Sequence, residues 1–179
     1  MQQILLNRYL AKFDEIKALF PEIINAETSK EAVKRFDDML IDAYIEGFAS
    51  AAYILGEDIS VNNAELDEAI HKEYDGVSIQ NKAEQYYNDN DPESLRALLD
   101  SEYHRVYNTA RNNAYKGHGK RWVTVGDDKV RPTHDFLDGV EVGADERFYT
   151  YDGDSALFPG DFTSAENNAN CRCIIDYLP

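Results

Sequence analysis

Two stretches near the end of the chain decide its fold: residues 126–143 read GDDKVRPTHDFLDGVEVG, and residues 168–173 read NANCRC. They hold Arg131, His134 and the two cysteines of the chain, Cys171 and Cys173, among Gly, Pro and Asp residues that are typical of turns. The rest of the sequence is interpreted outward from these two stretches, because the residue pattern changes where they begin.

Upstream of Gly117 the apolar residues recur at three- and four-residue steps, which predicts amphipathic helices. Pro21 is expected to end the first helix, and Asp75-Gly76 the third. Asp91 followed by Pro92 is a strong helix start, since Asp caps the free N–H groups and Pro suits the first turn. The small residues Ala43, Gly47 and Ala51 lie on one face of the second helix, where another helix can approach closely. The expected helices cover residues 2–20, 28–55, 63–74, 78–89 and 91–116.

Downstream of Gly119 the pattern favours short strands, because β-branched and aromatic residues alternate with turn residues. Residues 131–137 are expected to form one helical turn. The predicted strands cover residues 121–125, 139–143, 147–151 and 171–177. The expected fold class is therefore α+β: residues 1–116 form a helical region of four to five helices that makes protein contacts, and residues 117–179 form a small turn-rich module packed with helix 91–116.

Charge and cysteine spacing exclude several classes of function. The chain carries 18 Lys+Arg against 34 Asp+Glu, a net charge of −16, which argues against broad electrostatic binding of nucleic acid and fits a protein partner better. Two cysteines one residue apart cannot join distant segments, so a reducing setting is expected. The charged N-terminus lacks a signal-peptide core, and no stretch is long and apolar enough to span a membrane.

The Cys-X-Cys pair is the strongest candidate for metal binding. On a strand, Cys171 and Cys173 would face the same side, so that two thiolates could bind one zinc ion. His134 is the expected third ligand. For the fourth, the sequence offers Asp128, His118 or Asp161. Two cysteines on one strand face are also ordinary core residues, so both interpretations stay open.

A second hypothesis is an enzyme that cleaves phosphodiesters, with His134 as acid or base, Arg131 on the phosphate and the Asn170 amide nearby. The structural alternative has Arg131 paired with a carboxylate and His134 hydrogen-bonded to a turn. His71 and His104 lie on predicted helices and are expected to be surface or satisfied polar residues. Asp152-Gly153-Asp154 begins like a calcium loop but lacks the later acidic ligands, so a turn is expected.

Five motifs follow one another in fixed order: RWVT (121–124) leading to Asp128, VRPTH (130–134), LDG (137–139), FPGD (158–161) and NCRC (170–173). Together they resemble the phage Mu protein F-like family of minor head, or head morphogenesis, proteins. The resemblance covers about residues 95–178. It implies association with the phage portal protein and other capsid or scaffold proteins, inside the virion head and in the host cytoplasm during assembly. It also implies help in head assembly or DNA delivery. No enzymatic activity is expected in this module, and ADP-ribosyl transfer occurs in toxin domains attached to some relatives. The residues that carry the motifs are Trp122, Asp128, Arg131, Pro132, His134, Gly139, Pro159, Asp161, Asn170 and Arg172.

The resemblance also bears on the metal. Many relatives have Cys-X-X-Cys where this chain has Arg131-Pro132-Thr133-His134, so His134 stands at the second cysteine and Arg131 at the first. Histidine can replace cysteine as a ligand, whereas arginine cannot. Zinc bound by Cys171, Cys173, His134 and Asp128 is therefore one expectation. The other is a clasp in which Arg131 and His134 hydrogen-bond the segment that contains the cysteines.

Overall fold

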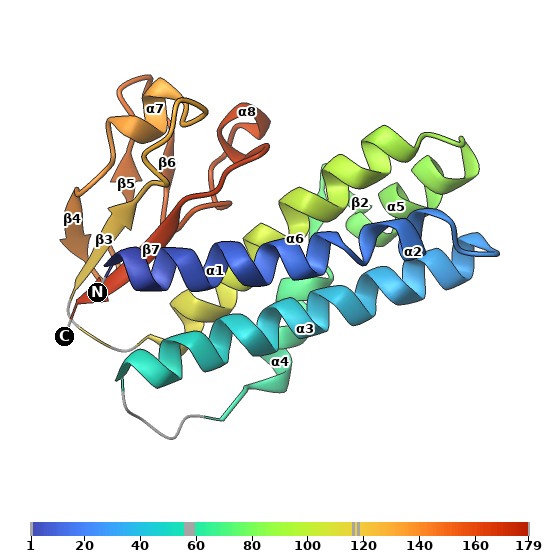
Figure 1. Cartoon of the computed structure of the whole chain (residues 1–179), viewed down its shortest axis with the longest axis horizontal. Coiled ribbons are helices and arrows are strands. Elements are labelled where there is room, and N and C mark those ends of the chain that lie inside the picture. Colours follow the sequence, from blue (N-terminus) through green and yellow to red (C-terminus); the bar gives the residue numbers. More distant parts are fainter. Residues whose placement is uncertain (1, 56–59, 116, 118, 179) are drawn as a thin grey trace.

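Three long helices form the body of the molecule. In the computed structural model, which describes residues 2–55, 60–115, 117 and 119–178, helices α1 (Gln2–Lys17), α3 (Ser29–Leu55) and α6 (Pro92–Ala114) lie alongside one another (Figure 1). Three shorter helices complete the body: α2 (Phe20–Ile24), α4 (Asn63–Ile70) and α5 (Ile79–Asn88). Their apolar faces bury one continuous core, which includes Tyr9, Phe36 and Tyr103.

The close packing of α3 against α6 depends on the small residues expected on the α3 face. Ala43 and Ala51 are buried. A Cβ atom added at Gly47 would lie 2.3 Å from the carbonyl oxygen of Tyr107, closer than real Cβ atoms approach a backbone atom. The missing side chain at Gly47 is therefore what allows the two helix backbones to meet at this point.

The start of α6 is confirmed, because Asp91 accepts a hydrogen bond from the Ser94 N–H at 3.0 Å and Pro92 occupies the first turn. The end of the first helix was predicted wrongly. Helix α1 ends at Lys17, and Pro21 lies in the first turn of α2, where its missing N–H costs nothing.

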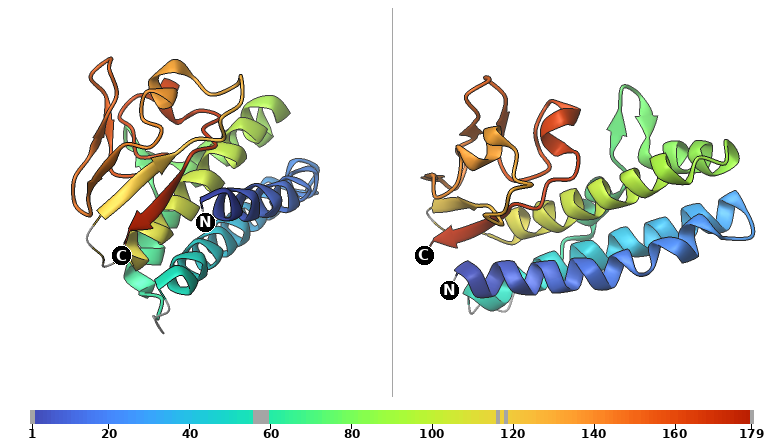
Figure 2. Two further views of the ribbon diagram at one scale, coloured as in Figure 1. Left: turned by 60° about the vertical axis from the view of Figure 1, so that its left-hand side comes forward. Right: turned by 45° about the horizontal axis from the view of Figure 1, so that its top comes forward.

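The helix predicted over residues 63–74 is also wrong over its last four residues. Helix α4 ends at Ile70 and is followed by a hairpin of β1 (Glu73–Tyr74) and β2 (Val77–Ser78), which protrudes from the body in Figure 2. Asp75 and Gly76 both have positive φ, 55° and 76°, as a two-residue hairpin turn requires. These two residues therefore close a hairpin and do not end a helix.

The C-terminal module is built on a three-stranded antiparallel sheet in the order β4-β3-β7. Its strands are β3 (Gly119–Val123), β4 (Glu141–Gly143) and β7 (Ile174–Leu178), and β3 pairs with β7 along its whole length (Figure 2). A second pair, β5 (Phe148–Tyr149) and β6 (Ser155–Ala156), and two helical turns, α7 (Pro132–Asp135) and α8 (Ala165–Asn168), cover it.

A second apolar core fills this module around Trp122, which is fully buried. Val123 and Ile174, which form the last pair of the β3–β7 ladder, belong instead to the core of the helical body, so the module packs directly on the helices. Strand β3 has the predicted length but begins two residues earlier, the other predicted strands are shorter than expected, and α8 was not predicted. The final strand begins at Ile174, so both cysteines precede it, contrary to the expectation for residues 171–177.

The fold class is confirmed as α+β, with a helical N-terminal region and small antiparallel sheets in the C-terminal part. Within the described residues, the helices are too short or too polar to cross a membrane.

Candidate metal centre at His134 and the two cysteines

His134 is held in place by a short helical turn and a tight aromatic environment. Arg131 precedes the turn α7 with extended backbone, and Pro132 supplies the preset φ of its first residue. The imidazole of His134 is buried, stacks on Phe162 at 5.1 Å between ring centroids, and meets the edge of Trp122 at 5.6 Å. Nε2 of His134 is buried without a hydrogen-bond partner, so the other nitrogen, Nδ1, makes the polar contacts of the ring.

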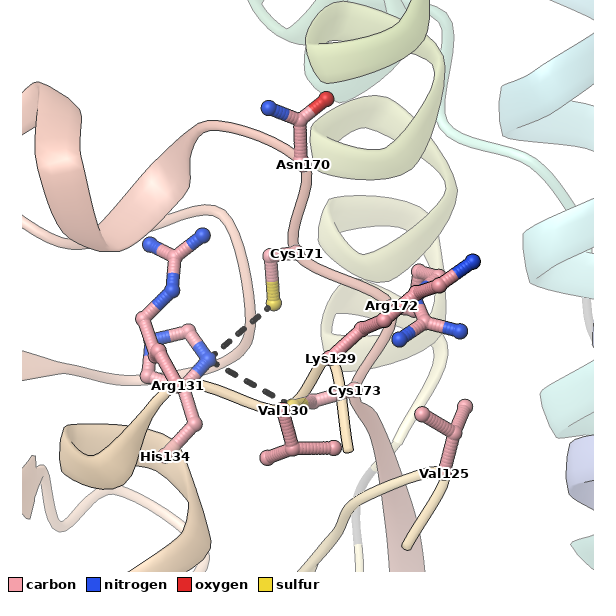
Figure 3. Close-up of a pocket in the computed structure, with 9 residues that line it drawn as sticks. All are labelled: Val125, Lys129, Val130, Arg131, His134, Asn170, Cys171, Arg172 and Cys173. Carbon is pink, nitrogen blue, oxygen red and sulfur yellow. Dashed lines mark hydrogen bonds between the residues drawn. The ribbon is translucent and has the colours of Figure 1, made fainter. Parts of the chain in front are cut away.

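Both cysteines point at that Nδ1 atom. Its distance to Sγ of Cys171 is 3.6 Å and to Sγ of Cys173 is 3.5 Å (Figure 3). Asn170 has a positive φ of 53°, which turns the chain into this segment, and Arg172 between the cysteines points outward. The extended alternation that was expected from a strand is therefore present, although the regular strand begins one residue later. The three ligand atoms lie within 4.8 Å of one another, and all three residues are buried.

A set of hydrogen bonds ties the same two segments together around this cluster. The Arg131 guanidinium donates to the carbonyl oxygens of Glu166 and Ala169, on either side of α8. The Thr133 hydroxyl donates to the Asn167 side chain at 3.0 Å. The clasp hypothesis had Arg131 and His134 bond the segment that contains the cysteines, whereas Arg131 engages backbone carbonyl groups just ahead of that segment.

Arg172 adds a second tie. Its guanidinium binds both carboxylate oxygens of Asp127 at 2.7 and 2.6 Å, and the pKa of Asp127 is lowered mainly by this contact. Asp127 lies in the turn that leads to Arg131, so the two ion-pair and backbone contacts hold both ends of residues 127–131 to residues 166–172.

The electrostatics of the cysteine pair favour one thiolate. Burial alone would raise the pKa of Cys171, but a hydrogen bond from Cys173 and the nearby His104 and His134 outweigh burial and hold it well below its ordinary value. The pKa of Cys173 is raised, because its proton is held by Cys171 and because it is buried. A thiolate, a thiol that shares its proton and an imidazole form a donor set that suits zinc.

The residues proposed as a fourth ligand lie elsewhere. Asp128 is exposed in its turn, and Asp161 pairs with Arg147 at 3.1 Å and accepts from the Leu157 N–H at 2.9 Å. Neither belongs to the group of ligand atoms that come together in the described part of the chain. His118 falls outside the described residues.

The residues of the phosphodiesterase hypothesis do come together. Arg131, His134 and Asn170 line one small pocket together with both cysteines (Figure 3). Within it, however, Arg131 is engaged by two carbonyl groups, and Nδ1 of His134 faces two sulfur atoms. Asn170 is exposed. In this arrangement the polar groups of Arg131 and His134 bind other parts of the same chain.

The other motif residues have structural positions. Trp122 lies at the centre of the module core, Pro159 is buried, and Gly139 has a φ of 77° that an L side chain would resist. Gly160, next to Pro159, has a φ of 97°, and an added Cβ would lie 3.0 Å from Cα of Arg105, so that this turn packs directly on α6.

His104 was expected to be a surface or satisfied polar residue, and it is a buried one that is hydrogen-bonded next to the cluster of His134, Cys171 and Cys173. Its ring is 1% exposed, its Nδ1 is hydrogen-bonded to the Tyr9 hydroxyl, and its side chain lies beside Cys171. The interaction with Tyr9 spans 95 residues, so local periodicity could not reveal it. Only the placement of His104 on the apolar face of α6, beside Tyr103 and Tyr107, hinted at burial.

The fold and the cluster define the class of protein: a mixed α+β chain with a helical body and a small β module that is closed by a buried His-Cys-Cys cluster. The family model described as phage Mu protein F like protein matches residues 60–176, roughly two-thirds of the chain. The chain therefore belongs to this family of phage head morphogenesis proteins, as the five motifs indicated.

One curated relative also matches. The NAD(+)--arginine ADP-ribosyltransferase EFV of Enterococcus faecalis (strain ATCC 700802 / V583) is 46% identical to this chain over 54 residues, which make up 30% of this chain and 11% of the relative. The chain thus spans a small part of that relative's length. No solved structure matches the chain.

Proposed function

We propose that the chain is a phage minor head protein that associates with the portal vertex and assists procapsid assembly or DNA delivery. The observation that carries this proposal is the family match over residues 60–176. The site supports a role without catalysis, because its most distinctive side chains bind one another and nearby backbone groups. Its place would be inside the virion head, and in the host cytoplasm during assembly.

The surface of the module fits a protein partner. Phe136 and Tyr151 are 58% and 61% exposed, and their rings meet edge to face at 5.8 Å. The exposed carboxylates of Asp135 and Asp152 lie next to them in the sequence. Exposed aromatic pairs with a charged rim are typical of protein interfaces, and this rim would attract basic side chains of the portal protein. A duplex of nucleic acid would be repelled by the same carboxylates.

Co-expression with the portal protein of the same phage tests the proposal. We expect the two proteins to co-purify, and we expect the double variant Phe136→Ser/Tyr151→Ser to lose the portal while it keeps its circular dichroism spectrum. The control is Tyr53→Ser, which removes an exposed aromatic residue of α3. A wild-type chain that never binds the portal would refute the proposed function. Unchanged binding by the double variant would refute only the assignment of this surface.

The second candidate function is a nuclease or other toxin-type effector that uses Arg131, His134 and Asn170. It is favoured by one observation, the pocket that all three residues line. Its test is cleavage of single- and double-stranded DNA and of RNA by the wild type and by His134→Ala. Cleavage that disappears in a folded variant would support it. A variant that unfolds, with no cleavage by the wild type, would leave His134 with a structural role.

A further inference from the structure

The distances from the His134 nitrogen to the two sulfur atoms match those of a zinc site. Zinc binds sulfur at about 2.3 Å and nitrogen at about 2.0–2.1 Å, so tetrahedral geometry places a ligating nitrogen and sulfur about 3.6 Å apart. The distances from His134 Nδ1 to the two sulfur atoms are 3.6 and 3.5 Å. The same distances also suit S–H···N hydrogen bonds, so the stronger argument for a metal is that three buried donor groups of the kind that zinc prefers converge on one point. The His134, Cys171 and Cys173 side chains therefore fit the metal.

A structural zinc site requires a fourth ligand, and the acidic residues proposed from the sequence do not supply it. His104 is the remaining described histidine that is buried, since His71 is half exposed at the end of α4. It projects from the middle of α6, the helix that runs directly beside the segment of Asn170 and Cys171 (Figure 3), and its side chain interacts with that of Cys171.

We propose that His104 is the fourth ligand of a zinc ion held by His134, Cys171 and Cys173. The ion would join helix α6 to the turn that holds His134 and to the segment that holds the two cysteines. His104 is not within 4.8 Å of all three other ligand atoms, so binding must draw its ring toward the sulfur atoms. Nothing in this inference depends on the proposed portal contact.

The surroundings of His104 suit a ligand. Nδ1 bonds to the Tyr9 hydroxyl, which leaves the lone pair of Nε2 as the one available for a metal. Zinc-binding histidines commonly donate their other ring N–H to an oxygen atom, and the Tyr9 oxygen occupies that position. The Asn108 amide nitrogen lies 3.4 and 3.3 Å from the two ring nitrogens, and a point nearly equidistant from both is off the lone-pair direction of either.

Metal titration of the full chain tests the proposal. We expect the reduced wild type, purified without chelators, to bind one equivalent of zinc. We expect cobalt(II) in its place to give the intense visible bands of a tetrahedral site. His104→Ala should lower zinc affinity at least tenfold and weaken those bands, and Tyr9→Phe should have a smaller effect in the same direction. The matched control is His71→Ala.

His104→Cys separates ligation from a merely structural role. A cysteine at this position should keep the tetrahedral cobalt spectrum and strengthen its sulfur-to-metal charge-transfer band, a change that packing alone cannot produce. Equal affinity and an identical cobalt spectrum in His104→Ala would refute the role of His104. A folded wild type that binds no zinc would refute the metal altogether and leave a hydrogen-bonded cluster, whatever the result of the portal experiment.

Discussion

The buried Lys120 offers a quantitative test of the energetics of the module. Its side chain is 0% exposed, its Nζ has no hydrogen-bond partner, and it lies 5.7 Å from the centre of the Phe148 ring. Burial lowers the pKa of Lys120 from 10.5 to about 8, although Asp145 and Asp161 partly oppose the shift. Folding therefore places the ammonium group in a less favourable environment than water.

The expected cost follows from that shift. The difference of about 2.5 pKa units corresponds to about 3 kcal/mol at pH 7, as an upper limit. In the unfolded chain Lys120 binds its proton more tightly, so its buried charge lowers the free energy of unfolding by the full amount below pH 8. This destabilisation falls as the pH rises from 8 and is gone above pH 10.5. Lys120→Met keeps the volume and removes the charge. We expect it to be more stable than the wild type by up to about 3 kcal/mol at pH 7, or about 6–12 °C in Tm.

The measurement is urea unfolding of both proteins from pH 7 to 10.5. The tyrosines that titrate in this range affect both proteins equally, so they cancel in the difference between the two free energies of unfolding. We expect the advantage of Lys120→Met to shrink towards zero over this interval. Lys30→Met, which replaces an exposed lysine at the start of α3, is the control and should show no such trend. A constant difference across the range, or a variant less stable than the wild type at pH 7, would contradict the reasoning.

Three further predictions concern packing and the clasp. Gly47→Ala should lower the free energy of unfolding by about 1–3 kcal/mol, because its Cβ would press on the carbonyl of Tyr107. Thermal unfolding measures this effect, and an unchanged Tm would show that α3 and α6 can move apart without loss of stability. Arg131→Ala should cost about 1–3 kcal/mol through two lost charge-assisted bonds, with Arg131→Lys recovering little; urea unfolding decides, and full recovery would argue against the forked contact. The pKa of Asp154 is about 2, because hydrogen bonds from Asn167 and Ser164 outweigh the opposing effect of burial, so its contribution should be complete above pH 4 and disappear as the pH falls through 2. Asp154→Asn should flatten that part of the stability curve, and an equally steep curve would refute the assignment.

Local signals in the sequence were enough for most of the helices. Asp91-Pro92 marked the start of α6, and the small face around Gly47 marked its contact with α3. The failure at residues 73–78 has a physical cause: Asp-Gly can end a helix or turn a hairpin, and only the pairing of Tyr74 with Val77 decides between them. Short-range patterns do not contain that pairing.

The candidate site, like the fold, could be predicted only in part from local sequence patterns. His134, Cys171 and Cys173 could be grouped from the sequence, because their residue types are unusual and the strand alternation is strict. Asp128 was chosen as a ligand from proximity in the sequence alone, and it is exposed away from the group. His104 could not be found, since its place beside Cys171 depends on how the module docks on α6, a contact between segments 67 residues apart.

Arg131 shows how the chain can lack a thiolate and still hold the same segments together. A cysteine at this position, as the resemblance implies for relatives, would act through a metal, whereas Arg131 reaches the carbonyl oxygens of Glu166 and Ala169 directly. The guanidinium can bind two acceptors at once, and its partners are backbone atoms that no substitution of Glu166 or Ala169 removes. Loop 126–135 would then be attached to residues 166–173 by three independent contacts: Arg131 with the backbone, Asp127 with Arg172, and His134 with the two sulfur atoms. Removal of the proposed zinc ion should therefore loosen the contact with α6 at His104 before it separates these two segments. Hydrogen exchange of α6 and of residues 166–173 with and without chelator would measure that order.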